Sequence, residues 1–334
     1  MGYRLRVTGY GLWAIGLLAV VLTACSHVPE TEVSVRACAS MPNGGVACAC
    51  ACVCDGKAYV FGGRDSAGTY QNKMWCYDPQ TDNWTSLGAA PFKARVNATM
   101  AAVDDKVYVG LGYSALRAYN DSAYRKDWWE YTPSTHTWQQ KANYPNKNTV
   151  AATSYVIDGD IYAIYGFGNH YSKQICRYSP TDNIWAEPID ASNPAPYYHF
   201  GGRGALHNGM VYFGMGYTTN GNIRDWCEAD LKTNTWTKRA SVPGKSRAFG
   251  ACAGNADYIY VFGGRHFAGE FTGGEVFDSY MRYLPEKDSW EWCGTMPCGR
   301  AENLIAFSIN GKIYFGLGEN ENGKVVDALY RIED

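Results

Sequence analysis

The chain has almost no net charge and few histidines, and each shortage disfavours a class of function. Its 30 basic residues nearly balance its 32 acidic ones, which gives a formal net charge of −2. Nucleic-acid-binding domains carry a basic patch or stripe, so no nucleic-acid partner is expected. The six histidines include no pair at short ligand spacing, and no zinc-protease motif, phosphate-binding glycine loop or serine nucleophile elbow occurs. We expect neither a metal nor a cofactor.

Long apolar runs are also scarce. Residues 14–22 form a run of nine that is too short to cross a bilayer, and it follows two arginines near the N-terminus, as in a signal peptide. The run ends in Leu22-Thr23-Ala24-Cys25, which resembles the bacterial lipobox, where cleavage precedes a cysteine that is then lipidated. No later segment could cross a membrane, so we expect contact with the membrane through this lipid anchor alone.

The lipobox resemblance implies a cell-envelope protein. Residues 1–24 would be a lipoprotein signal peptide, and residues 25–32 a tether that is lipidated (with palmitate among its acyl chains) at Cys25. Ser26 stands where an aspartate would retain a Gram-negative lipoprotein in the inner membrane, so the resemblance implies the outer membrane. The alternative is an ordinary cleaved signal peptide with an incidental cysteine.

What the chain has in abundance is a repeated pattern of short strands. Residues 57–84 contain an apolar run closed by Gly62-Gly63, a polar loop, an aromatic run and an Asp-Pro turn before Trp84. Paired glycines allow positive φ, Asp-Pro presets a turn, and aromatic runs between such breaks favour strands. The tyrosine of the first run recurs at steps of 49, 54, 50, 48 and 54 residues, as Tyr59, Tyr108, Tyr162, Tyr212, Tyr260 and Tyr314.

The repeats number six, but only five have the tryptophan of the last strand. In four units this tryptophan lies seven residues before a proline, and Val35 lies seven residues before Pro42 in the N-terminal segment. That segment therefore supplies the strand that the last unit lacks. Because ring closure removes exposed sheet edges, we predict an all-β fold over residues 33–334: a six-bladed β-propeller closed by pairing the N-terminal strand with the last blade.

Double glycine, a following aromatic run and tryptophan at a period of about fifty residues resemble the Kelch repeat. The resemblance covers residues 33–334, although glycine pairs are intact only at Gly62-Gly63 and Gly263-Gly264. It implies the fold and leaves the function open, because propellers support unrelated activities.

Twelve cysteines in an exported chain would normally indicate disulfides. Four of them alternate between Cys48 and Cys54, so their side chains should share one face of a strand and cannot converge on one ion. We expect this segment to be the inner strand of the first blade, with cysteine in place of other small apolar residues. Cys293 and Cys298 are the one candidate for a local disulfide.

Ligand sites on propellers lie on one face, where loops from all blades meet. Two sets of aligned positions should reach that face. The post-glycine positions directly follow the glycines of each repeat, and they are Arg64, Tyr113, Phe167, Tyr217, Arg265 and Glu319. The pre-strand positions precede each inner strand, and they are Gly45, Arg95, Thr149, His199, Arg247 and Arg300, with Asn97 and Glu302 two residues further on.

These positions differ from blade to blade and carry charge, whereas framework positions repeat one residue. Arginine binds carboxylates bidentately and aromatic faces stack on sugars, so we expect a site for an anionic sugar or an acidic peptide segment. As ligand-binding residues we expect Arg64, Arg95, Tyr113, His199, Tyr217, Arg224, Arg247 and Arg265. The alternative for each arginine is a structural ion pair between elements.

Six-bladed bacterial Kelch proteins include N-acetylneuraminate epimerases, which are cofactor-free sialic-acid mutarotases, and the chain is distantly similar to them. That resemblance implies a glutamate base directly after one blade's glycines and an arginine soon after. Here the aligned loop carries Tyr217 at the glutamate position and Arg224 further along. A relocated base could be Glu319 or Glu302, with Arg300 nearby.

Three functions therefore stay open at this point. One is an envelope lipoprotein that binds an anionic glycan or a protein partner. The second is a sugar mutarotase, which needs a closed pocket around a carboxylate. The third is a purely protein-binding subunit of an envelope complex, which needs a flatter apolar patch.

Overall fold

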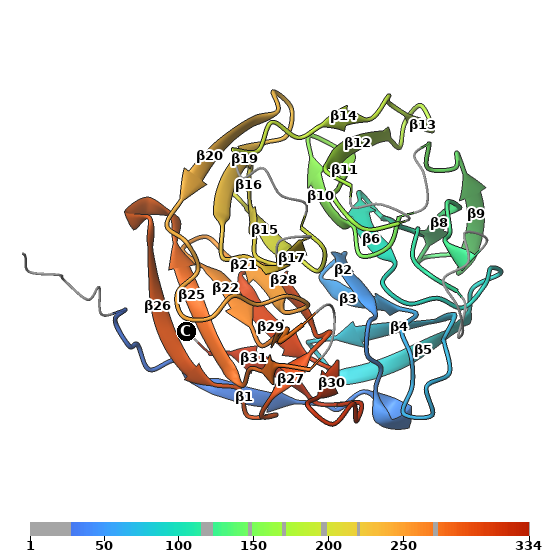
Figure 1. The fold of residues 1–334 in the computed structure, drawn as a ribbon. Coiled ribbons are helices and arrows are strands. Elements are labelled where there is room, and N and C mark those ends of the chain that lie inside the picture. Colours follow the sequence, from blue (N-terminus) through green and yellow to red (C-terminus); the bar gives the residue numbers. More distant parts are fainter. Residues whose placement is uncertain are drawn as a thin grey trace, which may run out of the picture.

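The structure is a computed structural model, and it describes residues 28–114, 123–145, 149–168, 172–194, 199–218, 221–269 and 273–333. Six antiparallel sheets stand around a central axis, each radiating outward from it (Figure 1). The innermost strands of neighbouring sheets contact one another around the whole ring, and contacts between β2 (Cys50–Cys54) and β28 (Ile305–Ile309) close it. The predicted six-bladed propeller is confirmed.

The first five blades run outward from the axis in chain order. The strands of the first three blades are β2, β3 (Lys57–Phe61), β4 (Lys73–Asp78) and β5 (Asn83–Ala89); β6 (Thr99–Val103), β7 (Lys106–Gly110), β8 (Trp128–Thr132) and β9 (Thr137–Lys141); and β10 (Thr153–Ile157), β11 (Asp160–Ile164), β12 (Gln174–Ser179), β13 (Ile184–Trp185) and β14 (Ile189–Asp190). The next two are β15 (Arg203–His207), β16 (Met210–Gly214), β19 (Trp226–Asp230) and β20 (Thr235–Arg239); and β21 (Ala251–Gly254), β22 (Ile259–Phe262), β25 (Ser279–Leu284) and β26 (Ser289–Thr295).

The sixth blade joins the two ends of the chain. It consists of β28, β29 (Lys312–Gly316), β31 (Leu329–Ile332) and, outermost, β1 (Val35–Cys38). Val35 pairs with Ile332 and Cys38 with Leu329, so the N-terminal segment supplies the missing outer strand as predicted. The chain before it runs beside β26, where the Trp292 amide donates to the Pro29 carbonyl at 2.9 Å.

Short elements complete the fold. The two-stranded sheets are β17 (Tyr217–Thr218) with β18 (Gly221–Asn222), β23 (Arg265–His266) with β24 (Glu275–Val276), and β27 (Ala301–Glu302) with β30 (Glu319–Asn320), and the 3-10 turns described are Pro42–Gly44 and Pro285–Lys287. No helix among the described residues is both long and apolar enough to cross a membrane.

The turn between the third and fourth strands also fastens one blade to the previous one. In the first blade, Asp82 takes positive φ and its carboxylate accepts from the Tyr77 hydroxyl at 2.7 Å and the Ala39 amide at 2.8 Å. Trp84 donates its indole N–H to the Ala39 carbonyl at 2.8 Å. The aromatic, turn and tryptophan signals of the repeat therefore join adjacent blades, which explains their spacing.

The cysteines behave as small core residues. Cys50, Cys52 and Cys54 contribute to one apolar cluster between the first two blades, which confirms the predicted inner strand. Cys48 is an exception, because it precedes that strand and has left-handed backbone at φ 58°. All eleven cysteines of the described region are free thiols, Cys293 and Cys298 included, so the candidate disulfide between them does not form here.

Candidate ligand site at the mouth of the central channel

The post-glycine residues form one ring, as the repeat alignment predicts. Each lies opposite the chain that leads into an inner strand of its own blade, as in the bridges of Arg64 with Ala47 and of Arg265 with Ala248. Gly63 permits this close approach, because it has φ 86° and a Cβ there would lie 2.6 Å from the Ala47 carbonyl oxygen. The paired glycines therefore bring the next side chain to the channel mouth.

One half of this ring, from blades five, six and one, carries charge. Arg64 forms an ion pair with Glu319, and the Asn303 amide donates to the other oxygen of that carboxylate at 2.8 Å. Arg265 donates to one oxygen of Glu302 from Nε at 2.9 Å and from Nη2 at 2.5 Å. Glu302 and Glu319 are partners in the small sheet of β27 and β30. We call these four residues, with Asn303, the charged half of the mouth.

These ion pairs raise the pKa values of the two arginines in the charged half. Burial works against the Arg64 cation, yet the carboxylate of Glu319 raises its pKa. The hydrogen bond to Glu302 raises the pKa of Arg265. Burial, with a smaller effect of Glu319, raises the pKa of the Cys48 thiol to about 12, so this thiol is not a nucleophile at neutral pH. Each of the two glutamates is paired with one arginine.

The other half, from blades two to four with two rings from blade five, is aromatic. Phe200 lies between Phe167 and Phe249, with ring centroids 5.0 and 4.9 Å away, and Tyr217 contacts Phe267 at 5.5 Å. Tyr113 packs edge-on against Tyr124 at 5.0 Å. We call these seven residues the aromatic half of the mouth. An amphipathic ligand would meet charge on one side and ring faces on the other.

Two of the three pre-strand arginines, in contrast, lie beneath the surface. Arg95 is fully buried and forms a bidentate pair with Asp127 at 2.8 and 2.9 Å. Its Nη1 also donates to the carbonyl of Leu111 at 3.0 Å. Arg247 is equally buried and donates to the carbonyl of Gly263 at 3.0 Å. The two side chains are structural clasps, and their predicted role as ligand contacts does not fit this burial.

His199 occupies the same position in the fourth blade and makes the same kind of bond. Its Nδ1 lies 2.8 Å from the Met215 carbonyl, and burial lowers the pKa of the ring to about 4. Leu111, Gly263 and Met215 are equivalent residues with positive φ, each directly after a second strand. A repeated backbone acceptor therefore fixes Arg95, His199 and Arg247, and His199 is also too buried to meet a ligand.

Two further arginines do not pair with the mouth glutamates. Arg300 donates to the Val276 carbonyl at 3.1 Å and comes within 3.6 Å of Glu321, and the residue that pairs with Glu319 is Arg64. Arg224 is exposed and donates to the Gly244 carbonyl at 3.1 Å.

A band of backbone forms the rim between the mouth and the channel. Its six residues all have left-handed φ and occupy equivalent places; they are Cys48, Asn97, Ala151, Gly201, Phe249 and Asn303. Their amides donate to the carbonyl of the preceding blade's rim residue at five junctions, for example Asn97 to Cys48 at 2.8 Å and Asn303 to Phe249 at 2.7 Å. This rim holds the two halves of the mouth at fixed separation.

Sequence comparison places this architecture among known proteins. Residues 25–213, more than half of the chain, match the KLHDC2/KLHL20/DRC7 Kelch-repeats domain. The chain belongs to the Kelch-repeat family. Kelch-like protein 25 of Xenopus tropicalis is 28% identical to this Kelch propeller over 250 residues, which are 72% of the chain and 39% of that protein.

A bacterial enzyme is also similar. N-acetylneuraminate epimerase of Escherichia coli O1:K1 / APEC is 33% identical over 252 residues, which are 73% of this chain and 58% of that protein. The solved structure of YjhT matches with a TM-score of 0.73 at 18% identity, over 86% of this chain and 95% of that one, which supports the shared fold. The matches span only 39% to 58% of these curated relatives' length.

Sequence reasoning missed one residue of this Kelch propeller near the site. Arg203 opens the inner strand of the fourth blade and lines the central channel. The register of the inner strands places it level with Cys50, Thr99, Thr153, Ala251 and Ile305. Arg203 is the one charged residue among these equivalent positions. An alignment of the inner strands would have shown this difference.

Proposed function

We propose that this Kelch propeller is a cofactor-free isomerase that exchanges the anomers of a carboxylated sugar of the N-acetylneuraminate kind. The supporting observation is the charged half of the mouth, where two neighbouring carboxylates, Glu302 and Glu319, each sit against an arginine. The similarity to N-acetylneuraminate epimerases supports the sugar class. Charged groups beside aromatic rings also suit a sugar acid, which has a carboxylate and apolar ring faces.

Mutarotation requires only proton transfers. A base removes the proton of the anomeric hydroxyl while an acid gives a proton to the ring oxygen, so the bond between the anomeric carbon and the ring oxygen breaks. Rotation and reclosure on the other face reverse both transfers and regenerate acid and base. Glu319 is assigned as the base and Glu302 as the acid, because the two are backbone neighbours with side chains only 8% exposed.

The arginines would bind the sugar carboxylate. A ligand carboxylate that takes a fork of Arg64 or Arg265 displaces the glutamate from that cation, and the released glutamate is then available for proton transfer. Binding and activation are thus one event, which explains why a catalytic carboxylate would rest in an ion pair.

The test is saturation-exchange NMR of N-acetylneuraminate with the purified protein. We expect faster anomer exchange than in buffer, and a roughly 10²- to 10⁴-fold loss of the added rate in Glu319→Gln, the range that general acid–base groups contribute. Glu286→Gln, on an exposed turn of the fifth blade, is the matched control. Exchange at the buffer rate for the folded wild-type protein would refute the enzyme proposal.

The second candidate is binding without catalysis, of an anionic glycan or an acidic peptide segment. It is favoured by the ion pairs that already occupy both mouth glutamates and by Tyr217 at the position where the resembled epimerases carry glutamate. Broadened ligand signals with unchanged exchange would support it. If neither effect occurs, a protein partner becomes the leading hypothesis.

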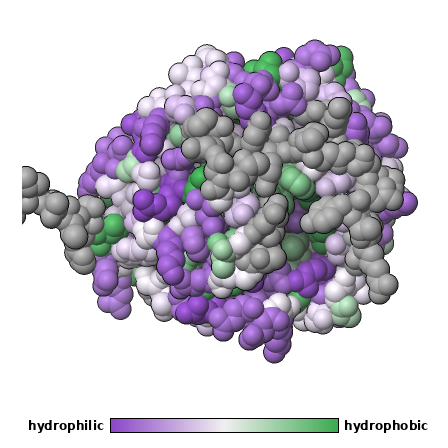
Figure 2. All heavy atoms as spheres, viewed as in Figure 1, coloured by the Kyte–Doolittle hydropathy of each residue, from purple (hydrophilic) through white to green (hydrophobic). Residues whose placement is uncertain are grey.

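A flat apolar interface has less support than a ligand site. Seen along the ring axis, most of the described surface is hydrophilic (Figure 2). Among the described residues the exposed large hydrophobic side chains are Ile184, Ile189 and Leu206, and the first two lie on the outer edge of the third blade. These few residues make a purely protein-binding subunit the weakest of the three functions.

We further propose that the protein is anchored in the bacterial outer membrane by lipid on Cys25, a residue that lies outside the described part of the chain. The supporting observation is the lipobox-like Leu22-Thr23-Ala24-Cys25. Cells fed labelled palmitate should label the wild-type protein and not Cys25→Ala, with label recovered in the outer-membrane fraction. Equal labelling of both proteins, or of neither, would contradict the anchor.

A further inference from the structure

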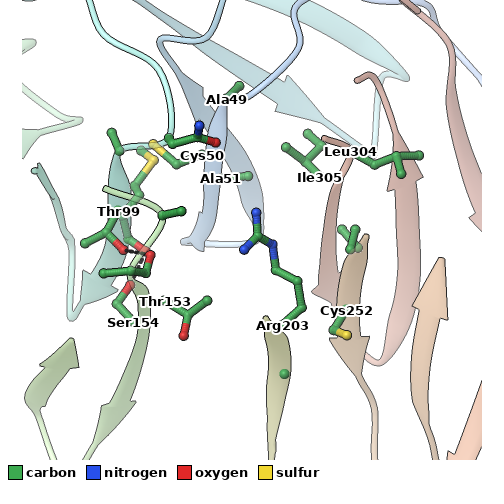
Figure 3. Close-up of a pocket in the computed structure, with 18 of the residues that line it drawn as sticks. Ala49, Cys50, Ala51, Thr99, Thr153, Ser154, Arg203, Cys252, Leu304 and Ile305 are labelled. Atoms are coloured by element: carbon green, nitrogen blue, oxygen red, sulfur yellow. Dashed lines mark hydrogen bonds between the residues drawn. The ribbon is translucent and has the colours of Figure 1, made fainter. Parts of the chain in front are cut away.

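The central channel below the rim contains a single cation in otherwise small-residue walls. A cavity of about 200 Å³ is lined by the inner strands of all six blades. Most of its lining is alanine, cysteine and hydroxyl side chains, and Arg203 is the one charged residue in it. Figure 3 shows the Arg203 side chain extending from β15 into the middle of this space, toward β2. A single water needs only about 10–15 Å³ by this kind of measure, so the cavity can hold an ion with waters.

Arg203 lacks the partners that every arginine of the mouth has. Its one side-chain hydrogen bond in the described structure goes from Nη1 to the carbonyl of its neighbour Gly202, at 2.9 Å. No described carboxylate lies within ion-pair distance of it, whereas Arg64, Arg95 and Arg265 each have one. An arginine stays protonated in proteins, so an unpaired one removed from bulk water calls for a counter-ion.

Two hydroxyl groups beside this cation also lack partners. Thr153 Oγ1 and Tyr155 Oη are buried and lie near each other, but neither makes a hydrogen bond of regular geometry to the described residues, and Tyr155 is only 7% exposed. Both residues line the same cavity as Arg203. Gly204, next to Arg203, makes room for the phenol, because a Cβ there would lie 2.8 Å from Tyr155 Oη. Buried hydroxyls normally have a partner, so these two donors indicate an acceptor in the channel.

We propose that the channel binds a small anion, held by the Arg203 guanidinium and by the hydroxyls of Tyr155 and Thr153. The site takes either an inorganic anion or the carboxylate of a small organic acid, because both present a compact negative charge that accepts several donors. It lies below the rim and uses none of the mouth residues, so it does not depend on the proposed isomerase activity.

The test is the chlorine NMR linewidth of sodium chloride added to the full-length protein, purified in non-ionic detergent and chloride-free buffer. The wild-type protein should broaden the signal by exchange at the site. Arg203→Gln should lose most of this broadening, whereas Arg36→Gln, an exposed arginine on β1, should keep it. Equal broadening in all three proteins would mean adventitious surface binding only and would overturn the proposal.

A more conservative variant tests the site in case Arg203→Gln does not fold. Tyr155→Phe removes one oxygen and keeps the ring, and we expect it to weaken chloride binding roughly ten- to a hundredfold, the range for one hydrogen bond to a charged group. Unchanged binding in Tyr155→Phe and Arg203→Gln, with both variants folded by circular dichroism, would overturn the site. Added N-acetylneuraminate then separates the sources: competition assigns the site to a sugar carboxylate, and no competition to an inorganic anion.

Discussion

Arginine occurs at two sets of repeat-equivalent positions in this propeller, and its surroundings differ between them. Before the inner strands, Arg95 and Arg247 are buried and bind the backbone carbonyls of Leu111 and Gly263. After the glycines, Arg64 and Arg265 lie at the channel mouth and pair with glutamate side chains. The first kind of acceptor exists in every blade, and the second exists only where a particular blade carries the glutamate.

The difference shows how a repeat protein separates framework from site. A partner supplied by the backbone recurs with the repeat, so a donor that reaches it becomes part of the scaffold, as His199 does. A partner supplied by a side chain can be exchanged for a ligand of like charge. The glutamates at the mouth can be exchanged in this way, and the carbonyls under the surface cannot.

The largest effect that distinguishes the two rings should be on stability. Arg95→Met should lower the free energy of unfolding by about 3–5 kcal/mol, because it leaves Asp127 and a buried carbonyl without their cation. Arg64→Met, at the mouth, should cost roughly 1 kcal/mol, because that pair is partly solvated and Asn303 still donates to Glu319.

Urea denaturation at neutral pH measures both variants, with intrinsic tryptophan fluorescence as the signal. Arg36→Gln is the control for loss of an exposed arginine. Similar losses in Arg95→Met and Arg64→Met would contradict the division into framework and site.

The next effect concerns pH and comes from His199. Because burial lowers the pKa of its folded ring from 6.5 to about 4, the unfolded chain binds more protons between these values. The free energy of unfolding should therefore fall as the pH drops through this window, by roughly 2 kcal/mol between pH 7 and pH 5.

Replacement by an amide tests this assignment. His199→Asn keeps a donor near the Met215 carbonyl and cannot titrate, so its unfolding free energy should vary less between pH 7 and pH 5 than that of the wild type. An equal pH dependence in both proteins would show that other groups cause it.

The sequence predicts this fold far better than it predicts the site. The spacing of Tyr59 and its equivalents, with Val35 in place of a tryptophan, gives the blade count and the closure by β1, because period and turn chemistry are local properties of the chain. The alignment also places Arg64, Arg265 and Glu319 in one ring, as the structure has them.

What the sequence could not give is the direction of each side chain. The alignment predicts that both Arg95 and Arg64 reach the ligand face. Arg95 is buried instead because the carbonyl of Leu111, a residue with left-handed backbone, faces it and accepts its hydrogen bond. Arg203 went unnoticed because the glycine alignment compares the loops, while the signal lies within the inner strands. Partners that come from distant turns are visible only once the blades are assembled.

The smallest effect should be on ligand affinity at the mouth. Arg265→Lys keeps the charge beside Glu302 but loses the fork that Nε and Nη2 present to that carboxylate. A lysine ammonium binds carboxylates as a point charge, so the affinity for N-acetylneuraminate should fall about tenfold. The free energy of unfolding should change by less than about 1 kcal/mol, because the pair is partly exposed and remains charged.

Titration calorimetry with the sugar acid measures the affinity, and Arg177→Lys on the outside of the third blade is the matched control. A drop in stability as large as that of Arg95→Met would place Arg265 with the framework arginines. A drop in affinity without such a loss of stability would show that the two rings of arginines differ in role. The pre-strand arginines would then stabilise the fold, and the post-glycine arginines would bind the ligand.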